Sequence, residues 1–122
     1  IGTEIIYQHH SIKGDEIGEL SLNDFKIFCN ELTNLPHGGI YLNVGSAVIL
    51  PEVLLKALSV VINLGTVMEE ITTVNLDMMR HYRTEVNVLK RPTVKKSRSY
   101  NLTGQHELLI PLLHQSILET AP

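Results

Sequence analysis

Residues 39–65 read GIYLNVGSAVILPEVLLKALSVVINLG, and this stretch decides the fold. Its first part, Ile40–Val44, is short and mostly apolar, which predicts a buried strand. Gly45 and Ser46 then break the strand. A helix is expected from about Pro51 to Leu64, because proline suits the first turn of a helix and Gly65 stands where a left-handed C-cap belongs. The stretch therefore predicts a strand–turn–helix unit.

The helix expected at 51–64 is apolar on nearly every side. Its polar positions are few: Glu52, Lys56, Ser59 and Asn63. A helix without a broad polar face is buried. We expect it to pack against a sheet or to lie at a contact between subunits.

The chain before residue 39 predicts one further helix. Gly14 and Gly18 bracket an acidic stretch that we interpret as a loop, and Ser21 is a good N-cap for a helix over about residues 22–34. Leu35–Gly39 contains proline and two glycines and ends that helix. A short strand is possible at Thr3–Tyr7.

The chain after residue 65 predicts two strands and a last helix. Residues 71–76 and 86–89 are rich in β-branched side chains and read as strands. The basic stretch 90–98 reads as a loop, and Thr103 as the cap of a helix over about residues 105–119. Pro111 falls inside that helix, which is therefore kinked or starts late.

A strand, a buried helix and another apolar strand form the βαβ unit of a parallel sheet. The sequence thus predicts an α/β fold of Rossmann-like, three-layer type with a mostly parallel sheet. Both faces of such a sheet need cover, and the chain has few elements to supply it. Residues 1–122 are therefore interpreted as a single α/β domain, the C-terminal part of a larger one, completed by a missing N-terminal segment or by another subunit.

Composition restricts the classes of protein. The chain has 122 residues, 43% hydrophobic and 19% charged, which is a globular composition. Its net charge of −3 argues against a nucleic-acid partner. No apolar run approaches the roughly 18 residues of a membrane span, so no membrane partner is expected. Cys29 is the only cysteine, which excludes an intrachain disulfide and favours the reducing cytoplasm; we expect it to pack as a small core residue.

Two pairs of residues are the candidate ligand-binding positions. Gly45 and Ser46 follow a strand and precede a helix N-terminus, where backbone N–H groups and the helix dipole favour an anion such as phosphate. Asn75 and Asp77 end the next strand at the same sheet edge and could bind ribose hydroxyls. The alternatives are an ordinary tight turn at Gly45-Ser46 and an Asp77 that caps the turn 78–81. No G-x-G-x-x-G fingerprint is present.

His106 and Glu107 precede the last apolar run, and we expect them to face the same cleft in a polar or acid–base role. The basic stretch 90–98 could clamp a phosphate or be a solvated loop. The six histidines form no metal pattern: Asp77 and His81 could share a helix face, but a third ligand is not evident. No metal site is predicted.

Three segments together resemble a known family: Ile1–Ile6, Gly39–Glu52 followed by Leu55–Leu58, and Thr72–Asp77. They look like an uncharacterised bacterial α/β family often labelled deoxyhypusine-synthase-like. The resemblance implies a Rossmann-like domain related to NAD-binding folds and a homo-oligomer with sites near subunit interfaces. Deoxyhypusine synthase forms its intermediate on a lysine within a Ser-Trp-Gly-Lys segment. This chain has no tryptophan and no such segment, so neither Lys56 nor Lys90 inherits that role, and true deoxyhypusine synthase activity is not expected.

Three hypotheses follow for the function. The first is an enzyme domain that binds NAD or another nucleotide and acts on a small polar or amine substrate. The second is a non-catalytic oligomerisation or interaction module, in which the apolar helix 51–64 packs across a subunit interface. The third is a sugar-phosphate-binding lobe of the isomerase type, with Ser46 and Thr72 holding phosphate.

Overall fold

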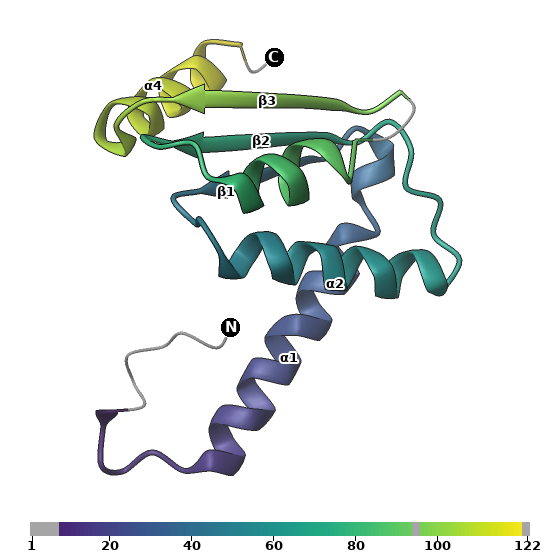
Figure 1. Cartoon of the computed structure of the whole chain (residues 1–122), viewed down its shortest axis with the longest axis vertical. Coiled ribbons are helices and arrows are strands. Elements are labelled where there is room, and N and C mark those ends of the chain that lie inside the picture. Colours follow the sequence, from purple (N-terminus) through teal and green to yellow (C-terminus); the bar gives the residue numbers. More distant parts are fainter. Residues whose placement is uncertain (1–7, 94–95, 121–122) are drawn as a thin grey trace.

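The computed structural model of the chain describes residues 8–93 and 96–120. Its centre is a three-stranded sheet of order β1–β2–β3, in which all strands are parallel (Figure 1). The strands are β1 (Ile40–Val44), β2 (Thr72–Asp77) and β3 (Arg98–Thr103). The predicted α/β, Rossmann-like class with a mostly parallel sheet is confirmed.

The predicted strand at 86–89 is wrong, and the third strand lies later in the chain. Residues Tyr82–Thr84 form a short helix, α3, which continues into the π-helix η3 at Glu85–Lys90. A parallel strand cannot follow β2 so soon, because the crossover between parallel strands takes about a dozen residues or more. The β-branched side chain of Val88 instead packs in the helical layer, where it is fully buried. β3 occupies the end of the predicted basic loop and includes Thr103, the expected helix cap.

The first helix is longer than predicted. Helix α1 runs over Gly14–Leu32, so the stretch interpreted as an acidic loop is its first turns and Ser21 lies inside it. Asp15 and Glu16 stand in the first turn, where negative charge opposes the positive end of the helix dipole. Gly14 and Gly18 have a weak helix propensity, and both nevertheless lie within α1. The predicted strand at Thr3–Tyr7 lies outside the described residues.

The other helices follow the sequence pattern closely. A short 3-10 turn, η2, spans Leu35–His37, helix α2 spans Ile49–Asn63, and helix α4 spans His106–Thr120. Gly65 has a φ of +101°, which confirms its left-handed position after α2. The helix α4 passes through Pro111 and begins at His106, so the late start considered for it is wrong.

The core lies on one face of the sheet. Helices α1 and α2 and the segment α3–η3 pack on this covered face (Figure 1). The buried apolar side chains there include Leu54, Ala57, Val61 and Val88, and Cys29 packs against them as expected. Packing of α2 against α1 and the sheet thus buries one side of the helix, whereas Val60 and Ile62 on its other side are 38% and 52% exposed.

The opposite face of the sheet is uncovered within the described part of the chain. The strand register places alternate residues of the three strands on this face. Five apolar side chains of its outer strands remain between 41% and 60% exposed: Ile40, Leu42, Val44, Tyr100 and Leu102. On the central strand, Val74 and Leu76 of the same face are only 9% and 1% exposed. In the described residues, no helix is both long and apolar enough to cross a membrane.

Candidate functional site

The segments that follow the three strands meet at the carboxyl edge of the sheet. The Gly45 N–H donates to the Leu76 carbonyl at 3.0 Å, and His106 Nε2 lies 3.0 Å from the same oxygen. The Gly104 N–H donates to the Asp77 carbonyl at 3.2 Å. The structure therefore brings together the segments of Gly45, Asp77 and His106, although Gly45 and His106 stand 61 residues apart in the chain.

The backbone conformation of Gly45 and its lack of a side chain both allow the contact with His106. Its φ is +66°, in the left-handed region that favours glycine. A Cβ added there would lie 3.1 Å from His106 Cε1. The turn and the imidazole thus pack so closely that a side chain at position 45 would displace the histidine.

The contact with Leu76 also fixes the tautomer of His106. A carbonyl oxygen only accepts hydrogen bonds, so the Nε2 atom must carry the proton. In the neutral ring Nδ1 is then the acceptor, able to take a proton from a reacting group. The ring is half-buried. Glu107, the other residue predicted for acid–base chemistry, lies exposed in the first turn of α4.

Ser46 holds the start of α2. Its Oγ accepts the Leu50 N–H at 3.2 Å, and its carbonyl accepts from Asn43 Nδ2 at 2.9 Å and Thr84 Oγ1 at 3.3 Å. The hydroxyl proton of Ser46 is not used in these bonds and can be donated to a ligand oxygen. The Gly45 N–H, in contrast, is engaged by Leu76, so an anion at this turn would meet the later N–H groups of the loop.

Asn75 belongs to a ladder of three asparagines that crosses the sheet. Asn43 Nδ2 donates to Asn75 Oδ1 at 2.8 Å, and Asn75 Nδ2 donates to Asn101 Oδ1 at 2.9 Å. Asn75 is 2% exposed, so its amide supports the neighbouring strands from the covered face. Asn43 and Asn101 are site residues that the sequence interpretation missed. Their signal was present, since each strand carries one asparagine between two apolar or aromatic residues, in register.

Asp77 ends β2 and turns the chain. Its Oδ1 accepts the Met79 N–H at 3.2 Å, the Asx-type bond expected of a residue that caps the following turn. The side chain is half-buried at the edge. One carboxylate oxygen makes this bond, and a carboxylate has further acceptor sites for ligand hydroxyls.

A cluster of polar side chains lies between the start of α2 and η3. Asn87 Nδ2 donates to Glu52 Oε1 at 2.9 Å, and Arg91 Nη1 donates to Asn87 Oδ1 at 3.2 Å. Arg83 Nε lies 3.6 Å from the same Glu52 oxygen. These bonds join α2 to α3–η3 beneath the carboxyl edge. Among the described side chains, Asn43 Oδ1 and Thr73 Oγ1 are buried without a hydrogen-bond partner; Thr73 lies toward the amino end of β2.

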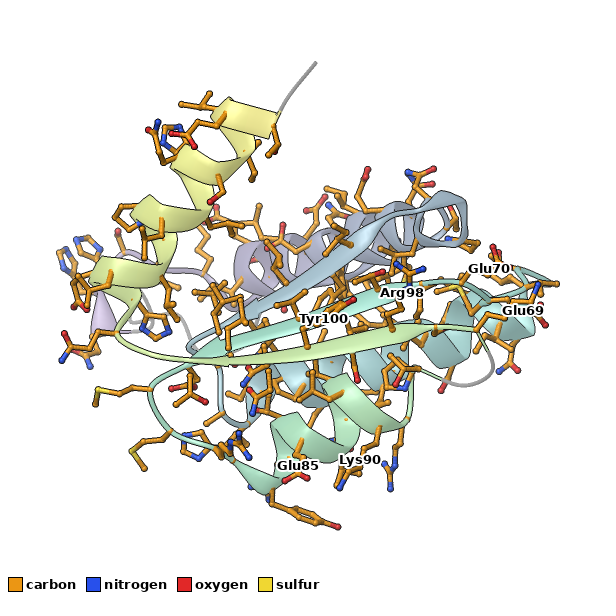
Figure 2. All side chains as sticks on the ribbon, turned by 90° about the horizontal axis from the view of Figure 1, so that it is seen from above. Glu69, Glu70, Glu85, Lys90, Arg98 and Tyr100 are labelled. Carbon is orange, nitrogen blue, oxygen red and sulfur yellow. The ribbon has the colours of Figure 1, made fainter. Side chains whose placement is uncertain are left out.

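Two basic residues of the stretch 90–98, Lys90 and Lys96, are paired with acidic side chains of the chain. Lys90 pairs with Glu85 at 2.8 Å, and this hydrogen bond and charge lower the pKa of the Glu85 carboxyl. Lys96 pairs with Glu70 at 3.2 Å, beside a cavity of about 440 Å³ at the amino ends of β2 and β3. Figure 2 shows Glu70 well apart from the Glu85–Lys90 pair. These two lysines thus bind acidic side chains of the same chain, and Arg91 binds the Asn87 amide. Within the described ranges, no cluster of three metal-ligating side chains is found.

Comparison with known proteins adds no assignment: no family model, curated protein or solved structure matches this chain. The resemblance to the deoxyhypusine-synthase-like family stays a prediction from the segments that carry it.

Proposed function

We propose that this chain is a nucleotide-binding α/β domain of an enzyme, with NAD or another nucleotide bound at the carboxyl edge of the sheet. The observation that carries the proposal is the convergence of Gly45, Asp77 and His106 on the Leu76–Asp77 backbone. In open parallel sheets, ligands bind outside the carboxyl ends of the strands.

Each group at the edge has a chemical role in this proposal. The Ser46 hydroxyl and the N–H groups of the loop before α2 hold phosphate, because the positive end of the helix dipole lies there. Within the first turn of α2, the Leu50 N–H is bonded to Ser46 Oγ, the Glu52 N–H is bonded to the Val48 carbonyl, and Pro51 has no N–H. The Asp77 carboxylate accepts hydrogen bonds from the ribose hydroxyls. His106 stands between them, with Nε2 anchored and Nδ1 available for proton transfer to a small polar or amine substrate. Glu107 is the second candidate for proton transfer, and Asn75 positions the strands.

The test is titration of the full chain with NAD, followed by calorimetry and by thermal shift. Asp77→Asn keeps an oxygen for the Met79 N–H and removes the charge, so the turn stays intact. We expect it to weaken NAD binding at least tenfold and to leave the affinity for inorganic phosphate unchanged. The matched control is Asp24→Asn on the exposed side of α1, which should change neither the affinity for NAD nor the affinity for inorganic phosphate.

Two results would overturn the proposal. If neither NAD nor another nucleotide binds at millimolar concentration, the proposal of a nucleotide-binding site is refuted. Thermal protection by sugar phosphates, with none by NAD, would favour the isomerase-type lobe, in which Ser46 and Thr72 hold phosphate. Thr72 lies at the amino end of β2, which separates it from Ser46 by the length of the strand.

A further inference from the structure

The uncovered face of the sheet is the largest feature that the proposed function leaves unused. It is formed by the alternate residues of the three strands described above, and Arg98 is its one charged member. Figure 2 shows Arg98 and Tyr100 on the side of the sheet away from α3–η3. A parallel sheet is stable in water only when both faces are covered. This face therefore needs an occupant.

Helix α4 is the second element that leaves apolar side chains uncovered, although His106 at its start contacts Leu76. It contains no buried residue, and its apolar side chains Leu108, Ile110, Leu112, Ile117 and Leu118 are 47% to 63% exposed. The helix rises from the carboxyl end of β3 on the uncovered side of the sheet and runs away from the strands (Figures 1 and 2). A helix that is apolar around most of its circumference is normally buried.

We propose that two copies of this chain pair reciprocally, with α4 of each copy lying on the uncovered sheet face of the other. The contact is isologous, because the same two surfaces are used twice around a twofold axis. It covers both apolar features at once.

The dimensions of the two surfaces agree. A helix of 15 residues is about 22 Å long, and a strand of six residues spans about 20 Å. The exposed fractions of the five sheet side chains, and of the α4 side chains on one side of the helix, correspond to several hundred Å² on each surface. Reciprocal burial then removes on the order of 1,500 Å² from water, within the range of stable interfaces.

The charges are also complementary. Helix α4 carries Glu107 and Glu119 and contains no lysine or arginine. The sheet face carries Arg98, and the charge of Lys96 at the same amino edge is balanced by its partner Glu70. Opposite charges at the rim favour a contact between α4 and this face over contacts between two α4 helices, which would bring carboxylates together.

The first experiment measures the mass of the full chain in solution by light scattering after gel filtration. We expect twice the 13.7 kDa mass of one chain. Ile40→Glu, on the sheet face, should lower the mass to that of one chain. Ile27→Glu on α1 is the matched control, since Ile27 and Ile40 are the same residue type and both 60% exposed; it should leave the pair intact.

The second experiment tests the arrangement. In a Cys29→Ser background, a chain with Leu42→Cys is mixed with a chain carrying Leu112→Cys and treated with a short thiol cross-linker. The proposal predicts a cross-link between the two kinds of chain. Circular dichroism of Ile40→Glu confirms that the variant is folded. A wild-type chain of single mass would overturn the proposal. In a chain that carries both Leu42→Cys and Leu112→Cys, a cross-link formed only within the chain would also overturn it, because α4 would then fold back onto its own sheet.

Discussion

At the scale of the residue, the candidate site depends on one close contact, between Gly45 and His106. The glycine is required twice: for its positive φ and for the space that the imidazole occupies. The sequence predicts the need for a positive φ, because a glycine follows a strand at position 45. The sequence does not predict the contact with His106, because the histidine comes from a helix that begins 61 residues later in the chain. Only the folded sheet brings Gly45 and His106 together.

Gly45→Ala should therefore lower the free energy of unfolding by about 1–3 kcal/mol, through backbone strain and the clash with His106. In a His106→Ala background the same substitution should cost about 1–2 kcal/mol, because only the left-handed backbone strain remains. Urea unfolding of the four chains of this double-mutant cycle measures the difference. Equal costs in both backgrounds would show that the two residues are not in contact in solution.

Tyr41 gives the protein a pH dependence at the alkaline end. Burial raises the pKa of its phenol from 10.0 to about 12, beside the ring of Phe28 at 6.1 Å between centroids. Because the folded state holds the proton more tightly than the unfolded state, stability is complete below pH 10 and falls between pH 10 and 12. The loss reaches about 2–3 kcal/mol at pH 12.

Urea unfolding of the wild type and Tyr41→Phe between pH 9 and 12 checks this expectation. The difference between the two proteins should shrink or reverse as the pH rises, because phenylalanine cannot titrate. Tyr82→Phe is the control, since Tyr82 is 78% exposed and should follow the wild type. Parallel curves for Tyr41→Phe and the wild type would refute the assignment.

At the scale of the element, the same residue type has opposite effects at two positions. Gly18 lies within α1, and Gly65 follows α2 with a φ of +101°. Neither would meet another atom within 4 Å if it gained a Cβ. An added Cβ therefore makes no steric contact at either site, and the two substitutions differ only in the backbone conformation that alanine must adopt.

Gly18→Ala should raise the free energy of unfolding by about 0.5–1 kcal/mol, because alanine favours a helix interior. Gly65→Ala should lower it by about 1–2 kcal/mol, because alanine is strained at positive φ. Thermal and urea unfolding of both variants measure the two signs. A stabilising Gly65→Ala would mean that α2 ends differently from the structure described.

At the scale of the whole molecule, the fold is half of a layered structure. Helices cover one face of the sheet, and the opposite face and α4 expose apolar side chains. If two copies supply the missing layer to each other, folding and pairing are linked, and the stability of the chain depends on its concentration.

The melting temperature of the wild type should then rise by about 3–5 °C for each tenfold increase in protein concentration. The melting temperature of Ile40→Glu should not depend on concentration, because that chain does not pair. Differential scanning calorimetry over two decades of concentration makes the comparison. Identical, concentration-independent transitions in both chains would contradict the link between pairing and stability.

The sequence by itself determined the α/β class, the strand–turn–helix unit at 39–65 and the ends of α2, because these follow from local hydrophobic pattern, proline and glycine. It also placed Gly45, Ser46 and Asp77 at the ends of strands. Tertiary structure decided the rest. It made 86–89 a π-helix, since the crossover to a parallel strand needs length and Val88 is buried beside α2. It also placed Asn75 in a buried ladder and brought His106 against Gly45, because contacts between distant segments are set by sheet register, which no local pattern contains.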